Sequence, residues 1–396
     1  MKFAAVCDIS DQIRGVTYAK RDASAAPKGG YSPMLRANNI GEHGLLLEDL
    51  IYVPNSKISL KQRIVPNDVV VAASSGSISV VGKTAQARQG FDGAFGAFCK
   101  VLRPGPDVDP HYFGHYFKTA TYRQVVSRLA AGVNINNLKN EHLDNLRIPV
   151  PPLAEQKRIA RILDAADALR AKRREALAQL DTLLQSTFLD MFGDPVTNPM
   201  GWTKVRSGEL FLLPPKIGTI TPARGRGYLV VRVGEVGESR IAFERCGRVA
   251  ISDIDVAKFR LERGDTVIAR AIGSKKHLGK ASYFAGFDET IVIDSHVMRL
   301  RPDPIKCDGL WFYSLISSDR GKVLLQQTGG ATAVQFNINA KQASSMEVAL
   351  PPLDLQDQFV SIVESVECQK ASQRAHLAEL DTLFASLQSR AFRGDL

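Results

Sequence analysis

The chain has 396 residues, of which 44% are hydrophobic and 23% charged, and it carries a formal net charge of +10 at pH 7. This length predicts two or three domains, and the balanced composition excludes an intrinsically disordered protein. No apolar run is long enough to span a membrane or to form the core of a signal peptide, so we expect a cytoplasmic protein without a membrane partner. The excess of Lys and Arg favours a polyanionic partner such as nucleic acid.

Residues 1–152 are predicted to form a mixed domain of short strands and helices. Apolar runs within 31–44, 63–77 and 95–110 end in Gly or Pro, as strands commonly do, and residues 111–130 have a more helical pattern. The segment that follows leads into a Pro-Pro pair, which marks the end of the domain.

One turn in this domain, residues 76–84 (GSISVVGKT), resembles a phosphate-binding loop. That motif has four residues between its first glycine and the Gly-Lys pair, whereas five separate Gly76 from Gly82. The second half of the chain repeats the same spacing between Gly273 and Gly279. We interpret both as structural turns.

A long helix is predicted for residues 153–192, and a second copy of it lies at residues 351–396, at a constant offset of 200. Both copies begin with Pro-Pro-Leu-x-x-Gln and contain Leu-Asp-Thr-Leu, at 180–183 and 380–383. Pro-Pro sets an extended lead-in, and neither helix contains Gly or Pro until its end. Each helix would span about 50 to 55 Å.

A coiled-coil period runs through both helices, with a polar break at the same two positions of each copy. Polar residues at such positions can fix the register of two helices at some cost in stability. We expect the helices to separate two domains as a spacer, although a buried hairpin that fills a core is the alternative. The predicted pairing residues are Leu163, Arg170, Arg173, Leu177, Leu180, Leu184, Val363, Lys370, Gln373, Leu377, Leu380 and Phe384.

Residues 193–350 are predicted to form a second mixed domain that repeats the first in outline. The runs at 228–239 and 263–274 correspond to those at 31–44 and 63–77, at offsets slightly below 200. The sequence therefore predicts an α+β fold in which two mixed α/β domains form a tandem repeat, separated by two long coiled-coil helices.

Neither domain shows a catalytic constellation. The five cysteines are far apart without a CxxC pair, which is typical of free thiols in a reducing compartment and predicts neither a disulfide framework nor a zinc site. A GxGxxG fingerprint and an HExxH motif are also missing from the sequence. We therefore expect a protein that is not an enzyme and holds no metal or cofactor of its own.

Polar and basic loop residues are the candidates for contacts with nucleic acid. Arg and Lys bind phosphates or the O6 and N7 atoms of guanine, and Asn can pair with the N6 and N7 atoms of adenine. The candidates are Arg36, Asn38, Asn39 and Lys83 in the first domain, and Arg224, Arg226, Arg232, Lys275, Lys276, His277 and Lys280 in the second. A solvated basic surface is the alternative for each residue taken singly.

The order of these motifs resembles the specificity (S) subunits of type I restriction-modification systems. The resemblance covers essentially the whole chain and rests on the Pro-Pro-Leu-x-x-Gln lead-ins with Gln156 and Gln356, the Leu-Asp-Thr-Leu helices, the joint FGDPVTNPMGW, and the segments NDVVVAASSGSISVVGK and GDTVIARAIGSKKHLGK. It implies two target-recognition domains, each reading one half of a bipartite double-stranded DNA target. The long helices would pack antiparallel and set the spacer between the halves.

The resemblance also implies a non-catalytic adaptor. Such a subunit positions two methyltransferase (M) subunits, which use S-adenosylmethionine, and restriction (R) subunits, which use ATP and Mg²⁺, so these cofactors would belong to the partners. Two alternatives remain open. A DNA methyltransferase or nuclease with an unrecognised active site would be favoured by binding of S-adenosylmethionine to the isolated chain. A structural coiled-coil protein would be favoured by absent or salt-insensitive DNA binding.

Overall fold

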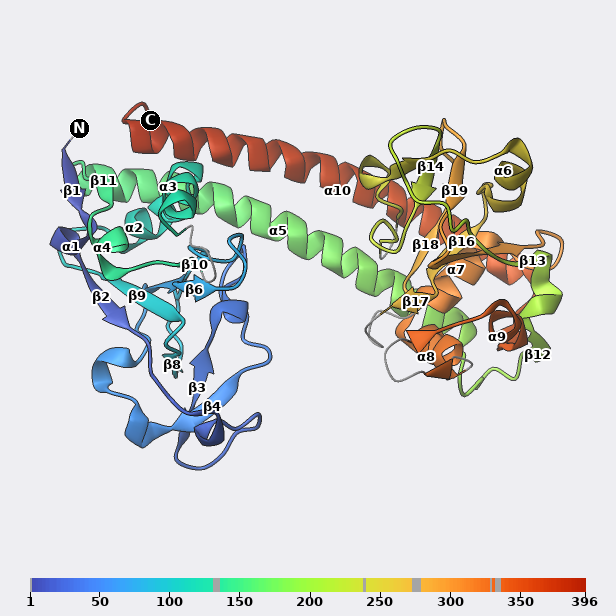
Figure 1. Cartoon of the computed structure of the whole chain (residues 1–396), viewed down its shortest axis with the longest axis horizontal. Helices are drawn as coiled ribbons and strands as arrows, with labels where there is room; N and C mark the ends of the chain where they lie inside the picture. The colour runs from blue at the N-terminus through green and yellow to red at the C-terminus, as the bar shows by residue number, and fades with distance from the viewer. Residues whose placement is uncertain (1, 131–135, 238–239, 273–278, 328–329, 332–335) are drawn as a thin grey trace. The chain divides into compact units, whose positions relative to one another are not determined.

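The computed structural model describes residues 2–130, 136–237, 240–272, 279–327, 330–331 and 336–396. The chain divides into two compact units (Figure 1). Unit 1 comprises Met1–Arg174 and Arg374–Leu396, and unit 2 comprises Glu175–Gln373. Each unit contains one mixed domain and part of both long helices, which confirms the predicted α+β fold class. The predicted limits of the individual domains stay a prediction.

The mixed domain of unit 1 consists of short strands and four helices. Its strands are β1 (Phe3–Ala5), β2 (Ser10–Arg14), β3 (Tyr31–Leu35), β4 (Ile51–Pro54), β5 (Val69–Ala72), β6 (Ser74–Ser75), β7 (Thr84–Gln86), β8 (Ala94–Phe95), β9 (Cys99–Pro104), β10 (Asn136–Asn137) and β11 (Arg147–Pro149). Its helices are α1 (Val6–Ile9), α2 (Pro110–Tyr116), α3 (Ala120–Ala130) and α4 (Asn140–Asp144).

A four-stranded antiparallel sheet, in the order β2-β9-β5-β7, is the centre of this domain. A second sheet has the order β4-β3-β8, with β3 parallel to β8. The central strand β5 is buried along its whole length, and its alternate residues enter different cores. Val69 and Val71 pack with the helices, whereas Val70 and Ala72 pack with the second sheet. Burial on both faces explains why this strand is uniformly apolar in sequence.

The domain of unit 2 repeats this arrangement. Its strands are β12 (Thr203–Arg206), β13 (Phe211–Ile217), β14 (Tyr228–Val231), β15 (Gly247–Val249), β16 (Thr266–Ala269), β17 (Ala271–Ile272), β18 (Ala281–Tyr283), β19 (Ile291–Ile293), β20 (Val297–Pro302), β21 (Gly330–Ala331), β22 (Phe336–Asn337) and β23 (Glu347–Leu350). Its helices are α6 (Asp253–Phe259), α7 (Gly309–Ser317), α8 (Asp319–Gln327) and α9 (Ala340–Ser345).

The strand orders of the two main sheets in each domain correspond one to one. The orders β13-β20-β16-β18 and β15-β14-β19 in unit 2 match β2-β9-β5-β7 and β4-β3-β8 in unit 1. The parallel pairing of β3 with β8 also recurs, between β14 and β19. The predicted tandem repeat is therefore confirmed at the level of sheet topology. Helix α6 of unit 2 takes the place of two short 3-10 turns in unit 1, at Asn55–Lys57 and Leu60–Gln62.

The long helices are α5 (Leu153–Phe192), with 40 residues, and α10 (Leu353–Arg393), with 41. The repeated glutamine at the start of each helix explains the Pro-Pro-Leu-x-x-Gln motif. The buried Gln156 accepts a hydrogen bond from the amide of Asp109 (2.8 Å) and donates to the Pro151 carbonyl (2.8 Å). In unit 2, Gln356 makes the same two bonds, at 2.9 Å each, with Asp308 and Pro351. Each glutamine thus ties a long helix to the start of α2 or α7.

A buried ion pair also recurs in both domains. Asp68 accepts two hydrogen bonds from the guanidinium of Arg103, both at 2.8 Å. Asp265 accepts two from Arg301, at 2.7 and 2.8 Å. Both aspartates are fully buried, and paired charge-assisted bonds of this kind hold the turn before the central strand against the neighbouring strand.

Candidate nucleic-acid interface

The ends of several strands of unit 1 meet at one side of its sheets. The register pairs Arg14, the last residue of β2, with Lys100 of β9, and β5 ends at Ala72 beside the start of β9. Strand β3 ends there too, because the amide of Gly96 donates to the carbonyl of Leu35 (2.9 Å). We call these strand ends and the loops beside them the unit 1 edge. Its side chains include Arg14, Arg36, Asn38, Lys83, Phe98 and Lys100.

Three of the four residues predicted in the first domain present their side chains at this edge. Asn38 and Lys83 are exposed, and Arg36 is half-buried. The guanidinium of Arg36 donates to the carbonyl of Asp49 (2.6 Å), which holds it beside its own loop. The carbonyl of Lys83 accepts from the amide of Ala72 (2.9 Å), so this lysine lies next to the end of the central strand.

Asn39, the fourth of these residues, is fully buried. Its Oδ1 accepts from the amide of Arg36 (2.9 Å), and its Nδ2 donates to the carbonyls of Leu46 and Glu48, both at 2.8 Å. A buried amide with these bonds cannot turn outward to pair with adenine without leaving backbone groups unsatisfied. The structure therefore corrects the prediction for Asn39, which closes the loop on which Asn38 is exposed.

A groove of about 830 Å³ opens at the unit 1 edge. The buried Lys100 donates from Nζ to the carbonyl of Leu138 (2.6 Å), and burial lowers the pKa of this lysine to about 8. Phe98 lies in the turn before β9 and is 69% exposed. The groove is lined by residues that include Arg14, Ala97, Cys99, Lys100, Asn137 and Lys139. Sequence reasoning missed Arg14, Phe98 and Lys100, because strand pairing alone brings them to one edge.

The residues predicted in the second domain lie on separate loops of unit 2. Arg224 and Arg226 are exposed between β13 and β14, and Lys280 is half-buried before β18. The guanidinium of Arg232 pairs with the carboxylate of Glu235 (3.0 Å between Nη2 and Oε1). Three further predicted residues, Lys275, Lys276 and His277, lie outside the described residues.

Arg270 of unit 2 lies at the end of β16 and is a further polar residue that the sequence did not single out. Its guanidinium donates to the carbonyls of Ile338 (3.1 Å) and Ser295 (2.8 Å) and to Oδ1 of Asn337 (2.6 Å). Burial lowers the pKa of this guanidinium. The residue therefore organises the strand ends of unit 2, as Lys100 does in unit 1.

Gly82 and Gly279, the glycines of the Gly-Lys pairs in the two segments that resemble a phosphate-binding loop, pack against helices. Gly82 and Gly279 both have a positive φ, at +76° and +77°. A Cβ atom at Gly82 would lie 2.2 Å from the side chain of Val126 on α3, and one at Gly279 would lie 2.7 Å from Leu325 on α8. Glycine is thus required for backbone conformation and for close contact with a helix.

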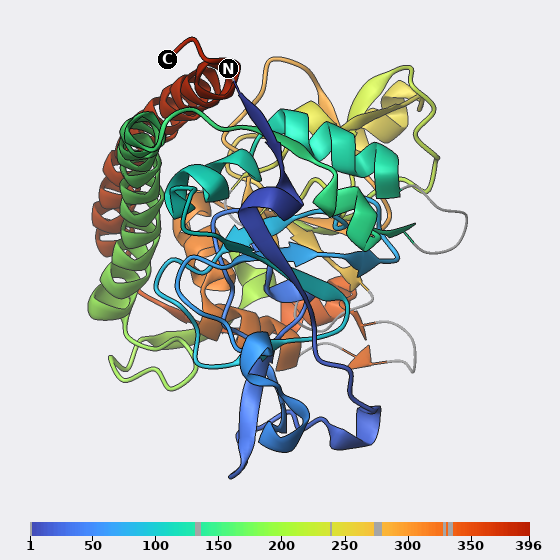
Figure 2. The same ribbon diagram turned by 90° about the vertical axis from the view of Figure 1, so that its left-hand side faces the viewer.

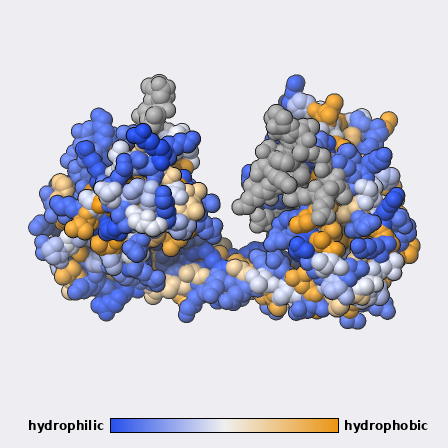
Figure 3. Space-filling view, turned by 90° about the horizontal axis from the view of Figure 1, so that it is seen from below, coloured by the Kyte–Doolittle hydropathy of each residue, from blue (hydrophilic) through white to orange (hydrophobic). Residues whose placement is uncertain are grey.

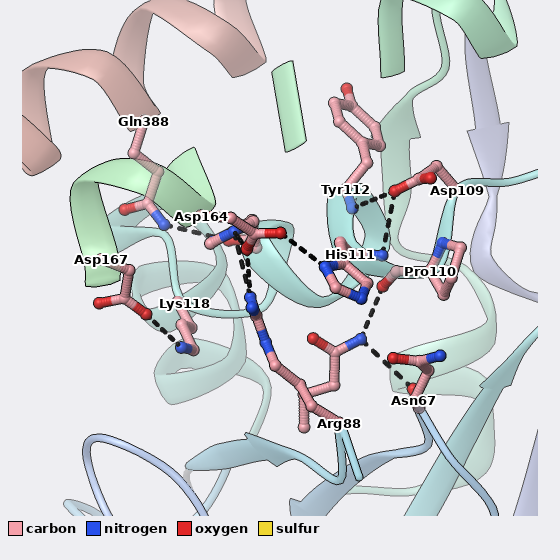
Figure 4. Close-up of polar contacts among 12 residues, drawn as sticks. Asn67, Arg88, Asp109, Pro110, His111, Tyr112, Lys118, Asp164, Asp167 and Gln388 are labelled. Carbon is pink, nitrogen blue, oxygen red and sulfur yellow. Dashed lines mark hydrogen bonds and ion pairs between the residues drawn. The ribbon is translucent and has the colours of Figure 1, made fainter. Parts of the chain in front are cut away.

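A polar cluster joins the domain of unit 1 to α5 (Figure 4). Asp164 of α5 accepts hydrogen bonds from His111 (2.6 Å to Nδ1) and His115 (2.8 Å to Nε2), and from Arg88 (2.5 Å to Nη2). Burial would raise the pKa of the Asp164 carboxyl, but these donors outweigh burial and lower it. In Figure 4, Gln388 reaches from α10 to this region, where it donates to the His115 carbonyl (3.0 Å).

The residues predicted to pair the two long helices follow the expected period of burial. Leu163, Val363, Lys370 and Phe384 are buried. The remaining predicted positions are half-buried, and they are Arg170, Arg173, Leu177, Leu180, Leu184, Gln373, Leu377 and Leu380. In unit 1 the two helices lie side by side, as Figure 2 shows.

In each unit, the basic residue that interrupts the apolar seam pairs with an aspartate of the opposite helix. In unit 1, Arg170 donates to Asp381 (2.6 Å) and to Asp167 (2.9 Å) and lies over the ring of Phe384. In unit 2, Lys370 pairs with Asp181 (2.7 Å) and with Glu367. Arg170 and Lys370 are equivalent in the repeat, as are Asp381 and Asp181, so both units pair their helices antiparallel through the same two positions.

Hydrophilic residues predominate on the face of unit 1 that Figure 3 shows, with smaller hydrophobic patches among them. Within the described part of the chain, no group of three or more His, Cys, Asp or Glu residues is arranged to hold a metal ion. Among the same residues, no helix combines the length and the apolar character needed to cross a membrane.

Comparison with known proteins points to one family. A family model described as the type I restriction modification DNA specificity domain matches residues 2–179. The chain is 32% identical over 419 residues to the EcoKI specificity subunit of Escherichia coli, and 30% identical over 414 residues to the StySPI specificity subunit of Salmonella potsdam. Each alignment covers 99% of this chain and 88% of the relative.

Solved structures show the same fold. The S subunit of a type I restriction-modification system from M. genitalium aligns with a TM-score of 0.52 at 16% identity, over 99% of this chain and 96% of that one. A chain from a structure of the assembly and conformational transition of the type I R-M system aligns equally well, over 100% of this chain and 98% of that one.

Proposed function

Because the chain belongs to the family of type I restriction enzyme specificity subunits, we propose that each of its units reads one half of a bipartite DNA target. The chain is the DNA-specificity subunit of a type I restriction-modification system. The bases that it reads are a separate question, because sequence is read by individual side chains at base edges and not by the scaffold.

The observation that carries this proposal is that one scaffold is used twice with different side chains at the edge. Arg36 and Arg232 are equivalent, since each follows the strand that pairs in parallel with β8 or β19. Phe98 in the turn before β9, however, corresponds to His296 before β20, because the carbonyl of each accepts from the residue that follows the central strand, Ala73 or Arg270. Two units that present different side chains on the same frame suit two different half-sites, while the shared basic residues suit phosphate contacts that set the register on DNA.

The long helices are proposed to hold the two reading units apart and to bind two methyltransferase subunits. Leu169, Leu183, Ile362 and Leu383 are exposed although they are large and apolar, and all four occupy the same position of the heptad. Such a repeated exposed stripe beside the seam suits a helical partner, and its presence on both helices suits two copies of that partner. Restriction subunits would join the same complex.

Methylation and cleavage are proposed to be the work of these partners, with S-adenosylmethionine, ATP and Mg²⁺ bound by them and not by this chain. The relatives are described as specificity subunits, which does not favour the alternative of a DNA methyltransferase or nuclease. On this proposal the chain positions the DNA and carries out no chemical step.

The decisive experiment is a genome-wide map of methylated adenines in the host with and without the gene. We expect one two-part motif with a fixed gap to lose its methylation when the gene is deleted. An unchanged map would contradict the proposal if the chain still co-purifies with an expressed methyltransferase subunit.

A second measurement tests whether the unit 1 edge contacts DNA. With the intact complex, Lys83→Ala should weaken binding to all sequences alike and reduce the slope of log K against log salt by about 1, because one phosphate contact is lost. Lys57→Ala is the matched control, because Lys57 forms an ion pair with Asp22 in another loop (2.8 Å). Equal effects of the two substitutions would argue against the unit 1 edge as the DNA contact.

A further inference from the structure

We infer that two ion-pair clusters, one in each unit, determine how strictly the chain selects DNA targets with a single spacer length. We call them the unit 1 clasp (Asp167, Arg170 and Asp381) and the unit 2 clasp (Glu367, Lys370 and Asp181). This inference rests on the proposed function and adds the residues that set one of its parameters, the distance between the half-sites.

Both clasps have the same construction. A basic residue in the seam is held between an acidic residue one turn earlier on its own helix and the aspartate of the Leu-Asp-Thr-Leu motif on the other helix. Lys370 is only 2% exposed, so its charge depends on these two carboxylates. The repeat of 200 residues therefore preserves a basic seam residue and its acidic partner in both units.

Apolar packing alone leaves the register of such helices ambiguous. The seam repeats every seven residues, so a shift of one helix by one heptad again places apolar residues opposite apolar residues. A shift of this size moves the helix by about 10 Å, because each residue advances it by about 1.5 Å. That distance corresponds to about three base pairs of DNA at about 3.4 Å each.

The clasps oppose a heptad shift in either direction. A shift in one direction would place Arg374 opposite Arg170, and Lys370 opposite Arg174, so that like charges meet in the seam. A shift in the other direction would place Phe188 opposite Lys370 and leave that charge unpaired. In the observed register each basic residue faces an aspartate, and polar seam residues of this kind specify one register.

The clasps also lie next to the stretch of the helices that neither domain core reaches. The fully buried core positions on α5 end at Ala166 and resume at Phe188, and those on α10 pause between Lys370 and Phe384. Between these limits, half-buried leucines and the clasps supply the contacts that hold the two helices together. We therefore assign to the clasps the register of the two helices at the point where each unit meets this central stretch.

The test compares methylation by the intact complex on synthetic targets with the native gap, about three base pairs fewer and about three base pairs more, the change that a heptad shift would produce. The wild-type chain should methylate only the native gap. In the variant with Arg170→Leu and Lys370→Leu, the rates on the altered gaps should rise to within about tenfold of the native rate, because the bare central stretch can bend or slide. The preferred half-site sequences should not change.

Two controls separate the clasps from general effects. The exchange variant, Arg170→Lys with Lys370→Arg, keeps both clasps and should stay strict. The variant with Lys157→Ala and Lys172→Ala removes the same number of charges from exposed positions of α5 and should stay strict as well.

A leucine variant that methylates the native gap and remains as strict as the wild type overturns the inference. If that variant is inactive on every target, the milder Asp181→Asn with Asp381→Asn decides, since strict gap choice in it also overturns the inference. Failure of the proposed function gives a different result, because the wild type itself would then show no preference for any gap or sequence.

Discussion

Acidification should loosen α2 from the long helices of unit 1, because His115 is buried there as a neutral side chain. His115 is 1% exposed, and burial lowers its pKa below the ordinary value of 6.5, although the hydrogen bond to Asp164 opposes this. Its Nδ1 is buried and has no hydrogen-bond partner in the described part of the chain. A second proton would therefore be placed on a nitrogen that no described acceptor reaches.

The magnitude follows from the difference in proton binding between the folded and unfolded chain. A histidine whose pKa is lower in the folded chain than in the unfolded chain binds fewer protons when the chain is folded. The folded state therefore loses stability as the pH falls through the pKa of the unfolded chain. Between pH 7.5 and 5.5, His115 would reduce the free energy of unfolding by up to about 1.4 kcal/mol. The lowered pKa of Asp164 acts in another window, since its contribution is lost only as the pH falls below the ordinary value of 3.8.

Hydrogen exchange measures this effect locally, with peptides that cover α2 followed at both pH values after correction for intrinsic rates. His115→Gln keeps a side-chain donor toward Asp164 but cannot titrate, so it should lose less stability than the wild type over this range, by up to about 1.4 kcal/mol. His111, Arg88, Asp167 and Lys118 face the cluster in both proteins, and their contributions cancel in the comparison. Equal losses in the two proteins would refute the assignment to His115. Peptides from α7 in unit 2 are the internal control.

Three further substitutions test the structure in other places. Asn39→Ala should lower the free energy of unfolding in urea by about 2 to 3 kcal/mol, because buried backbone groups lose their partners. Asn38→Ala should change this free energy by less than about 0.5 kcal/mol and affect only DNA binding. Equal costs of the two substitutions would contradict the burial of Asn39. Asp265→Ala should cost about 3 kcal/mol, because among the described residues Arg301 then keeps Glu262 as its one acidic partner, and an unchanged melting temperature would argue against the pair. Gln356→Leu should cost about 1 to 3 kcal/mol and increase hydrogen exchange at the start of α7.

The sequence was sufficient for the features that depend on local pattern. Helix α5 begins directly after the Pro-Pro pair and ends directly before Gly193, as the spacing of breakers predicts. The tandem repeat was visible because the offset of 200 preserves the seam and its polar break in both helices. Local propensity and periodicity act over a few residues, so they can be deduced from neighbours in the chain.

Exposure at single loop positions could not be deduced in the same way. Asn38 and Asn39 are adjacent and chemically identical, yet one is exposed and the other is fully buried. The difference depends on the path of the loop from Ile40 to Glu48, whose carbonyls take up the amide of Asn39. Lys100 was missed for the same reason, because its position beside Arg14 follows from the pairing of β2 with β9.

The sequence by itself determined that a basic residue interrupts the seam of each long helix and that an aspartate recurs in each Leu-Asp-Thr-Leu motif. Only the tertiary structure decided that Arg170 meets Asp381 and that Lys370 meets Asp181. A pairing between helices about 200 residues apart depends on their direction and axial register, and these are set by packing against the domains and by the charges themselves. Positions along one helix are fixed by its own geometry, whereas partners across two helices exist only once the chain has folded.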